Sequence, residues 1–332
     1  MFSGMGGFAT GLVQAGFSLR WASDNDKSAC EVFRHRFPGV TVVEKDVCEL
    51  SVAEDGLVAV DVLAAGFPCQ SFSQAGGRLG FDDPRGALFF EIPRLLGEFE
   101  PDCRPALVVL ENVPHLLYGA EGDWFDQVRR ALRRAGYWFR DTSCWTVNVK
   151  NATRLPQDRE RLFMVAASKA RFNRNPFSPP NEASKSLPPR PLSDFVDRSQ
   201  QGDEDAYLSL DNRYYKMINA AMSEGDSDKN IYQLRRSYVR EKKNGLCPTL
   251  TANMGIGGHN VPFIKDIKGI RRLSVKEIAK LQGFDCVESL FPNIHSTEQY
   301  RLLGNAVCVG LARLIAHQCA DILDHKEIAN EC

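Results

Sequence analysis

The chain has 332 residues, 43% of them hydrophobic and 25% charged, and a formal net charge of −1. This is the composition of an ordinary globular protein, and no apolar run approaches the ~20 residues that a membrane-spanning helix needs. The 10 cysteines form no Cys-x-x-Cys pair and no Cys/His cluster at zinc spacing, so the sequence indicates neither a disulfide framework nor a metal site. Because no signal-peptide pattern opens the chain, we expect a cytoplasmic protein.

The charges are unevenly placed along the chain. Residues 1–128 carry 9 Lys/Arg against 19 Asp/Glu, whereas residues 129–161 carry 9 against 3 and residues 231–280 carry 11 against 3. An acidic half joined to basic segments favours a small-molecule pocket next to a groove for a polyanion. A solvated charged face remains the alternative for any one of these runs.

A glycine-rich segment opens the chain, Phe2-Ser3-Gly4-Met5-Gly6-Gly7, and a helical pattern of apolar residues follows it. The free N–H groups of a helix N-terminus favour a carboxylate or a hydroxyl-rich ligand. Leu19–Ala22 then predicts a strand that ends near Asp24, where a doubly wound fold places an acid that binds ribose hydroxyls. For Asp26, capping of the next helix, about 27–37, is the alternative.

Two further strand patterns follow, at residues 41–43 and 60–65. The second of these is stopped by Gly66 and Pro68, and Cys69 follows at once. The carboxyl ends of strands are where ligands bind in a doubly wound fold, so Cys69 is a candidate nucleophile. A buried structural cysteine is the alternative, but the polar residues that follow Cys69 argue against it.

Three further features precede residue 170. Residues 106–110 predict a buried strand, and Glu111 after it suits a group that carries a proton. Helix patterns cover 87–97 and 124–135, and a strand pattern covers 137–145. Arg159 and Arg161 lie two apart on an extended segment, so they are predicted to point to one face, with salt bridges to their acidic neighbours as the alternative.

The amino-acid composition changes from about residue 171, where prolines mark a linker with little regular structure. Residues 232–240 mix arginine with tyrosine, a combination that suits phosphates and base edges, and residues 248–260 form a Thr/Gly-rich loop. The patterns then predict a helix over 271–284 and a last helix that opens at Gly304-Asn305-Ala306-Val307.

Six sequence motifs follow one another along the chain in the same order as in one known protein family. They are Phe2–Gly7, Pro68-Cys69-Gln70, Glu111-Asn112-Val113, Gln157–Arg161, Arg272–Phe284 and Gly304–Val307. In this the chain resembles the cytosine carbon-5 DNA methyltransferases. The resemblance implies an α/β fold, a doubly wound Rossmann-like mixed sheet of the class I S-adenosylmethionine-dependent methyltransferases, with a smaller irregular target-recognition domain. It divides the chain into a catalytic domain (1–168), a target-recognition domain (169–268) and a C-terminal segment (269–332) whose helix returns to the catalytic domain.

The resemblance also implies roles for individual residues. The catalytic residues would be Cys69, Glu111, Arg159, Arg161 and Ser73. The S-adenosylmethionine site would comprise Phe2, Ser3, Gly4, Met5, Gly6, Asp24, Asn25, Asp46, Val47, Gly66, Pro68, Leu88, Asn305 and Val307. The DNA contacts would be Arg235, Arg236, Arg240, Thr249, Thr251, Gly257 and Gly258.

The chain departs from the family pattern at two places. The family often has an aromatic residue that stacks on adenine where this chain has Asn25. The glycine-rich loop normally follows a central strand of apolar residues, but only Met1 precedes it here. Loss of a central strand leaves unpaired backbone groups and exposed apolar surface, so we expect weakened cofactor binding and stability.

The implied activity is methyl transfer from S-adenosylmethionine to carbon 5 of a flipped-out cytosine in a short duplex DNA sequence, through a covalent Cys69 intermediate. We expect a monomer, with a restriction endonuclease acting on the same site but not as a stable subunit. Three alternatives stay open: a tRNA cytosine-5 methyltransferase, a catalytically impaired DNA-binding protein, and a thiol hydrolase, for which no histidine partner of Cys69 is evident.

Overall fold

The computed structural model describes residues 1–72, 79–180, 188–199, 201–222, 230–235 and 237–330. In the last of these segments, side chains are described only as far as residue 324. The chain forms two compact units, which are described separately. Unit 1 comprises Met1–Val147, Glu160–Asn181 and Leu311–Cys332, and unit 2 comprises Asn148–Arg159 and Glu182–Gly310. The division of roles among residues 1–168, 169–268 and 269–332 stays a prediction.

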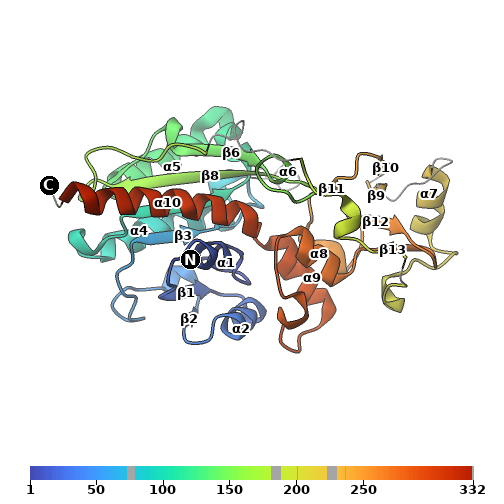
Figure 1. Ribbon diagram of the computed structural model, residues 1–332. Coiled ribbons are helices and arrows are strands. Elements are labelled where there is room, and N and C mark those ends of the chain that lie inside the picture. Colours follow the sequence, from blue (N-terminus) through green and yellow to red (C-terminus); the bar gives the residue numbers. More distant parts are fainter. Residues whose placement is uncertain (73–78, 181–187, 200, 223–229, 236, 331–332) are drawn as a thin grey trace. The chain divides into compact units, whose positions relative to one another are not determined.

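Unit 1 consists of strands with helices packed around them (Figure 1). Its strands are β1 (Trp21–Asp24), β2 (Thr41–Glu44), β3 (Val62–Ala65), β4 (Leu107–Asn112), β5 (Tyr137–Trp138), β6 (Cys144–Asn148) and β8 (Glu160–Ser168). Its helices are α1 (Gly7–Gln14), α2 (Lys27–Arg36), α3 (Pro84–Ala87), α4 (Glu91–Glu98), α5 (Asp123–Arg134) and α10 (Val309–Asn330), the last from Leu311 onward.

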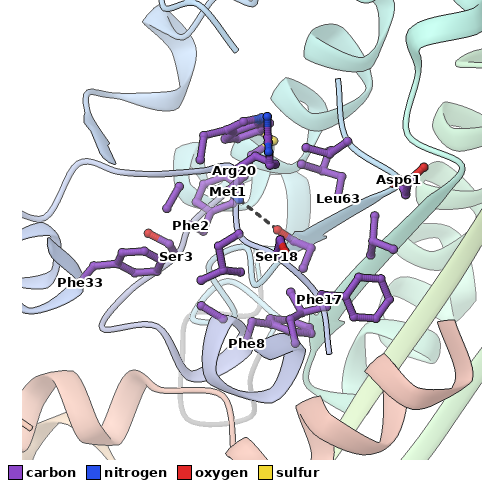
Figure 2. Close-up of a pocket in the computed structure, with 18 of the residues that line it drawn as sticks. Met1, Phe2, Ser3, Phe8, Phe17, Ser18, Arg20, Phe33, Asp61 and Leu63 are labelled. Atoms are coloured by element: carbon purple, nitrogen blue, oxygen red, sulfur yellow. Dashed lines mark hydrogen bonds between the residues drawn. The ribbon is translucent and has the colours of Figure 1, made fainter. Parts of the chain in front are cut away.

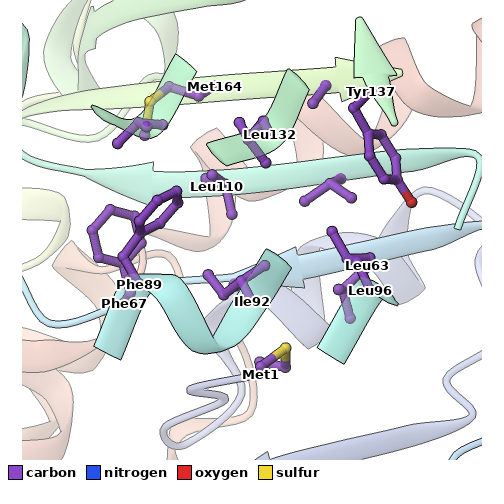
Figure 3. Close-up of a cluster of buried hydrophobic side chains, with 14 of the residues drawn as sticks. Met1, Leu63, Phe67, Phe89, Ile92, Leu96, Leu110, Leu132, Tyr137 and Met164 are labelled. Atoms are coloured by element: carbon purple, nitrogen blue, oxygen red, sulfur yellow. The ribbon is translucent and has the colours of Figure 1, made fainter. Parts of the chain in front are cut away.

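The main sheet of unit 1 has the order β3-β4-β8-β5, with β6 also paired to β8. β3 and β4 are parallel, whereas β8 runs antiparallel to β4 over six residue pairs that include Glu111 opposite Phe163. Every residue of β4 is buried, as its near-continuous apolar sequence predicts for a strand covered on both faces. Figure 3 shows the apolar cluster on one face, to which Leu63, Ile92, Leu96 and Leu110 contribute. The predicted mixed α/β sheet is confirmed.

β1 and β2 form a separate parallel pair in unit 1. A cavity of about 520 Å³ lies between β1 and β3, lined by both strands and by the residues that lead into them, Leu19–Ala22 and Ala59–Ala64 (Figure 2). The first residues of the chain connect the two sides at one end of this cavity. The Met1 ammonium group donates to Ala64 O (2.9 Å), and the Ser3 N–H donates to Ser23 O (3.1 Å).

Unit 2 is built around a four-stranded antiparallel sheet of order β10-β9-β12-β13. Its elements are α6 (Val149–Ala152), β7 (Gln157–Asp158), α7 (Arg213–Ala221), β9 (Ile231–Leu234), β10 (Val239–Lys242), β11 (Cys247–Pro248), β12 (Pro262–Lys265), β13 (Ile270–Arg272), α8 (Val275–Leu281) and α9 (Ser296–Asn305). A small core that includes Tyr232, Leu234 and Phe263 holds the sheet to α7. Arg271 is buried and paired with Asp266 and Glu277, which accounts for its charge in the interior.

The predicted strands and helices up to residue 135 are confirmed in kind, with α3, a short 3-10 turn and α4 in place of one helix over 87–97. Three later predictions are wrong in part. The segment 137–145 holds two strands, β5 and the start of β6, because a 3-10 turn intervenes. The helix expected from residue 271 begins only at Val275, since Ser274 caps it and residues 270–272 pair with β12. Residues 304–305 end α9, and α10 begins at Val309.

The C-terminal helix α10 packs against α1 within unit 1. A Cβ at Gly11 of α1 would lie 2.5 Å from Ala312 Cβ of α10, so only a glycine allows the two helices to approach this closely. Within the described part of the chain no single helix could span a membrane; α9 and α10 meet the length and composition test only as a pair bent by 41°.

Candidate active site

The Cys69 turn begins where β3 ends at the edge of the main sheet. Phe67 and Phe72 on either side of Cys69 are buried, and their rings meet edge to face with centroids 5.9 Å apart. The Phe72 N–H donates to Cys69 O (3.1 Å), which closes the turn. Cys69 itself is half-buried, so its thiol is neither a core group nor fully exposed. This placement fits a nucleophile better than a structural cysteine.

Glu111 lies in β4, one strand away from the Cys69 turn. Its carboxylate Oε1 is 2.8 Å from Arg161 Nε, and the two side chains are only 10% and 12% exposed. A nearly buried carboxylate is costly without a partner, and the guanidinium supplies one. Arg161 follows the start of β8, which brings it to the same sheet edge as Glu111.

Asn112 connects these two segments. Its side-chain amide donates to Phe67 O (3.1 Å), and both residues are fully buried. The backbone before Cys69 is therefore held by the residue that follows Glu111.

Arg159 and Arg161 have different partners, contrary to the prediction that they share one face. The strand breaks at Arg159, between β7 and β8, and the buried Arg159 guanidinium donates to Leu250 O (2.8 Å) and Ala306 O (3.1 Å) within unit 2. The alternation of a continuous strand does not apply across this break.

The glycine-rich loop is held by Asp24 at the end of β1. Asp24 Oδ2 accepts from Gly4 N (2.7 Å) and Oδ1 accepts from Asp26 N (3.0 Å). Burial raises the pKa of the Asp24 carboxyl, and the two N–H donors oppose that rise. A carboxylate has about four acceptor positions, so Asp24 keeps lone pairs for a ligand.

The loop enters α1 through Gly6, which has a φ of +89°. A Cβ there would lie 2.6 Å from the Phe37 ring, so this position requires glycine. Arg36 from α2 donates to Met5 O (2.6 Å) and to Thr10 Oγ1 (2.7 Å), and burial lowers its pKa to about 10. No sequence pattern indicates this role of Arg36, because its partners are 31 and 26 residues away in the chain.

Asp46 and Asn25 lie next to each other on the surface of unit 1. Asp46 accepts from Cys48 N (2.9 Å), and this bond, together with a smaller contribution from Asn25, holds the Asp46 pKa below its usual range. Val47 is buried. Asp26 caps α2, because its side chain accepts a hydrogen bond from Ala29 N. Helix capping was the alternative interpretation of Asp26.

The remaining cofactor candidates differ in exposure. Gly66, Pro68 and Leu88 are half-buried in unit 1, whereas Asn305 is exposed and Val307 half-buried in unit 2.

The loop residues fit a ligand with polar groups. The hydroxyl of Ser3 is buried and has no hydrogen-bond partner among the described residues, which is costly unless a bound group supplies one. The cavity of Figure 2 shares Phe2 and Ser3 with this loop, but it extends to the residues that enter β1 and β3, and neither Asp24 nor Asp46 is among its lining residues.

The DNA-contact candidates of unit 2 lie on two segments. Arg235 donates to Asn260 Oδ1 (2.5 Å), and Arg240 lies 3.5 Å from the hydroxyl of the half-exposed Tyr238. Thr249 donates to Asp158 O (2.8 Å) and Thr251 to Asn253 Oδ1 (2.6 Å). Gly257 and Gly258 have φ angles of +91° and +94°, which glycine adopts without strain.

Two predicted site residues, Ser73 and Arg236, lie outside the described residues. Arg85 forms a bidentate ion pair with Asp83 (2.7 and 3.0 Å).

The mixed sheet, the glycine-rich loop before α1 and the polar residues at the strand ends define a class I S-adenosylmethionine-dependent methyltransferase fold. The chain belongs to the C-5 cytosine-specific DNA methylase family, whose sequence profile matches residues 1–321. It transfers a methyl group to carbon 5 of cytosine in DNA, and its family implies the use of S-adenosylmethionine.

Known relatives span almost the whole chain. The type II methyltransferase M.Bsp6I of a Bacillus species is 36% identical over 319 residues, which is 95% of this chain and 96% of the relative. M.HhaI of Haemophilus parahaemolyticus is 27% identical and covers 98% of this chain and 94% of its own length. In fold, the chain is similar to the Dnmt2 methyltransferase of S. pombe, with a TM-score of 0.68, 18% identity and 97% of each chain covered.

Proposed function

We propose that Cys69 is the nucleophile of the reaction and that Glu111 and Arg161 act with it on the target cytosine. The observation that carries this proposal is the nearly buried Glu111–Arg161 ion pair at the strand edge from which the Cys69 turn departs. Asn112 supports it, because its bond to Phe67 O fixes the turn to the segment that holds Glu111.

The reaction begins with the Cys69 thiolate. Glu111 must carry a proton when the base arrives. The sulfur forms a bond to carbon 6 of the cytosine, the electron pair of the C5–C6 double bond moves to C4–C5, the C4–N3 pair moves to ring nitrogen 3, and Glu111 gives its proton to that nitrogen. Arg161 stabilises the carboxylate that Glu111 then becomes. S-adenosylmethionine, when bound, supplies an electron-poor methyl group to carbon 5.

Release reverses the activation. Carbon 5 loses its proton to water or another base, the C5–C6 double bond re-forms, and the bond to sulfur breaks. Nitrogen 3 returns its proton to Glu111, so both residues are restored. The target atom is unreachable in a duplex, so the cytosine must be flipped out of the helix. Ser73 would support the loop next to Cys69, and Arg159 would orient the base and its phosphate.

The cofactor would be held by Phe2, Ser3, Gly4, Met5 and Gly6 of the loop, with Asp24 on its ribose and Asp46 on its adenine. Asn25, Val47, Gly66, Pro68, Leu88, Asn305 and Val307 complete the set that the family resemblance assigns. The buried Ser3 hydroxyl supports this assignment.

Unit 2 would recognise the target sequence. Arg235, Arg236 and Arg240 are candidates for guanine and phosphate, and Thr249, Thr251, Gly257 and Gly258 for the backbone next to the flipped base. The partner would be duplex DNA, bound by a monomer in the cytoplasm, with a restriction endonuclease acting on the same sequence.

The test is transfer of a labelled methyl group from S-adenosylmethionine to duplex DNA and to tRNA, by the chain and by Cys69→Ser. We expect label in DNA only, and none with Cys69→Ser even though that variant still binds the same DNA sequence. Label in tRNA but not in DNA would replace the DNA substrate, and full turnover by Cys69→Ser would overturn the covalent mechanism.

A further inference from the structure

The Cys69 turn is joined to the segment after β4 on both sides of the cysteine. Asn112 donates to Phe67 O (3.1 Å) before Cys69, and His115 Nδ1 lies 2.9 Å from Phe72 O after it. A carbonyl oxygen only accepts hydrogen bonds, so Nδ1 of His115 carries the proton. Four residues beyond Glu111, the chain therefore holds the second end of the turn.

His115 has a fixed environment. Its ring meets the Trp124 indole edge to face with centroids 5.7 Å apart, and Trp124 meets Phe72 in the same way at 5.4 Å. Trp124 is itself enclosed, since a Cβ at either Gly80 or Gly119 would lie 2.0 Å from the indole. This packing keeps the imidazole from swinging away from Phe72.

The residues that follow positions 73–78 also contact these aromatic rings. Gly80 N donates to Ser71 O (3.1 Å), and Gly80 packs on Trp124. The backbone on either side of residues 73–78 is thus anchored at Trp124, and His115 is the side chain that hydrogen-bonds to Phe72 there.

We infer that His115 is a positioning residue for methyl transfer. Its Nδ1–H donates to the Phe72 carbonyl, and the Asn112 amide donates to the Phe67 carbonyl. Together these two hydrogen bonds set the orientation of the Cys69 thiol relative to Glu111. The inference rests on the proposed role of Cys69 as nucleophile.

A role in aromatic packing alone would give His115 the same surroundings, so the experiment separates the N–H donor from the ring. His115→Asn places an amide N–H near the position of Nδ1, and His115→Leu has almost the same shape without a donor. His115→Phe keeps a ring against Trp124 but cannot donate. His317→Asn, on the exposed side of α10, is the control substitution.

The measurements are the single-turnover rate of methyl transfer, the dissociation constants for DNA and S-adenosylmethionine, and the melting temperature. We expect His115→Leu and His115→Phe to slow transfer about 5- to 10-fold, the effect of one lost hydrogen bond, with both dissociation constants unchanged. His115→Asn should stay within about twofold of the parent chain. His115→Phe remains informative if His115→Leu fails to fold.

Equal rates for the parent chain and His115→Phe, or equal losses for His115→Asn and His115→Leu, would overturn the inference. A second readout separates it from the proposed function. DNA with 5-fluorocytosine at the target should form a covalent adduct on Cys69, and more slowly in His115→Phe. If the parent chain formed its adduct elsewhere, the role of Cys69 itself would be wrong.

Discussion

The proposed reaction needs two parts of unit 1, the nucleophile end with the Cys69 turn and the cofactor end with the loop of residues 2–6. The structure holds these two parts in place very differently. At the nucleophile end, β3, β4 and β8 are paired continuously, and Asn112 and His115 hold the turn that carries Cys69. At the cofactor end, β1 pairs with β2 and, among the described residues, with no other strand, and the cavity of Figure 2 lies between it and β3. The loop from Phe2 to Gly6 is held by side chains, chiefly Asp24 and Arg36. The turn of the proposed nucleophile is thus held by a continuous sheet, and the loop proposed to bind the methyl donor is not.

The cavity resembles the space that one more β-strand between β1 and β3 would occupy. Residues that enter β1 and β3 line both of its sides, Met1 and Ser3 bond to one side each, and Phe2 has a φ of +52°, which is rare for a residue other than glycine. Buried backbone groups without a strand between them are costly.

The largest effect on this comparison should come from filling the cavity. We expect four or five apolar β-formers placed before Met1 to raise the free energy of unfolding by several kcal/mol, because each fully buried side chain contributes about 1.5–3 kcal/mol. Affinity for S-adenosylmethionine should rise as well. The measurements are denaturant unfolding and calorimetric titration, with a Gly/Ser extension of equal length as the control.

Equal stability and affinity for the two extended chains would mean that the cavity does not accept a strand. The cofactor end would then be complete as it stands.

A smaller effect should follow from the buried amino terminus. Burial lowers the pKa of the Met1 ammonium group from 8.0 to about 6. Between these values the unfolded chain binds a proton that the folded chain does not, so stability should rise from pH 6 to pH 8, by about 2–3 kcal/mol. Acetylation of the amino group should remove this part of the pH dependence. Urea unfolding of both forms across that range is the measurement, and parallel profiles would contradict the assignment.

The smallest effect should come from Arg36. Its replacement by alanine leaves Met5 O and Thr10 without their donor, so we expect a loss of about 1–3 kcal/mol in stability and weaker cofactor binding, while the Cys69 adduct still forms at saturating cofactor. Arg34→Ala is the matched control, because its ion pair with Glu44 is exposed and is worth less than about 1 kcal/mol. If both variants behaved alike, Arg36 would not hold the loop.

The elements that the sequence predicted well are those with a local signal. Apolar runs stopped by glycine, proline or an acid marked β3 and β4, and with them the positions of Cys69 and Glu111 at one sheet edge. Asp24 and the loop of residues 2–7 were placed by the strand that precedes the acid and the helix that follows the glycines.

What the sequence missed depends on contacts between distant residues. Arg159 and Arg161 look like neighbours on one strand, but long-range carbonyls bind the first and Glu111 binds the second. The helix expected at 271 is a strand at its start, because Arg271 pairs with the buried Asp266 and Glu277. No periodicity encodes such pairs. His115 gave no signal either, since its partners are Phe72 and Trp124.

The most direct test of the account is to identify the residue that bonds to the target base. Duplex DNA with 5-fluorocytosine at the methylated position traps the covalent intermediate once the methyl group is transferred, because fluorine does not leave as a proton does. Proteolysis of the trapped complex and mass spectrometry of the linked peptide give its site. The account predicts the adduct on Cys69, in a peptide that contains residues 66–72. An adduct on any other cysteine, or methylation of ordinary DNA with no adduct on the fluorinated one, would contradict it.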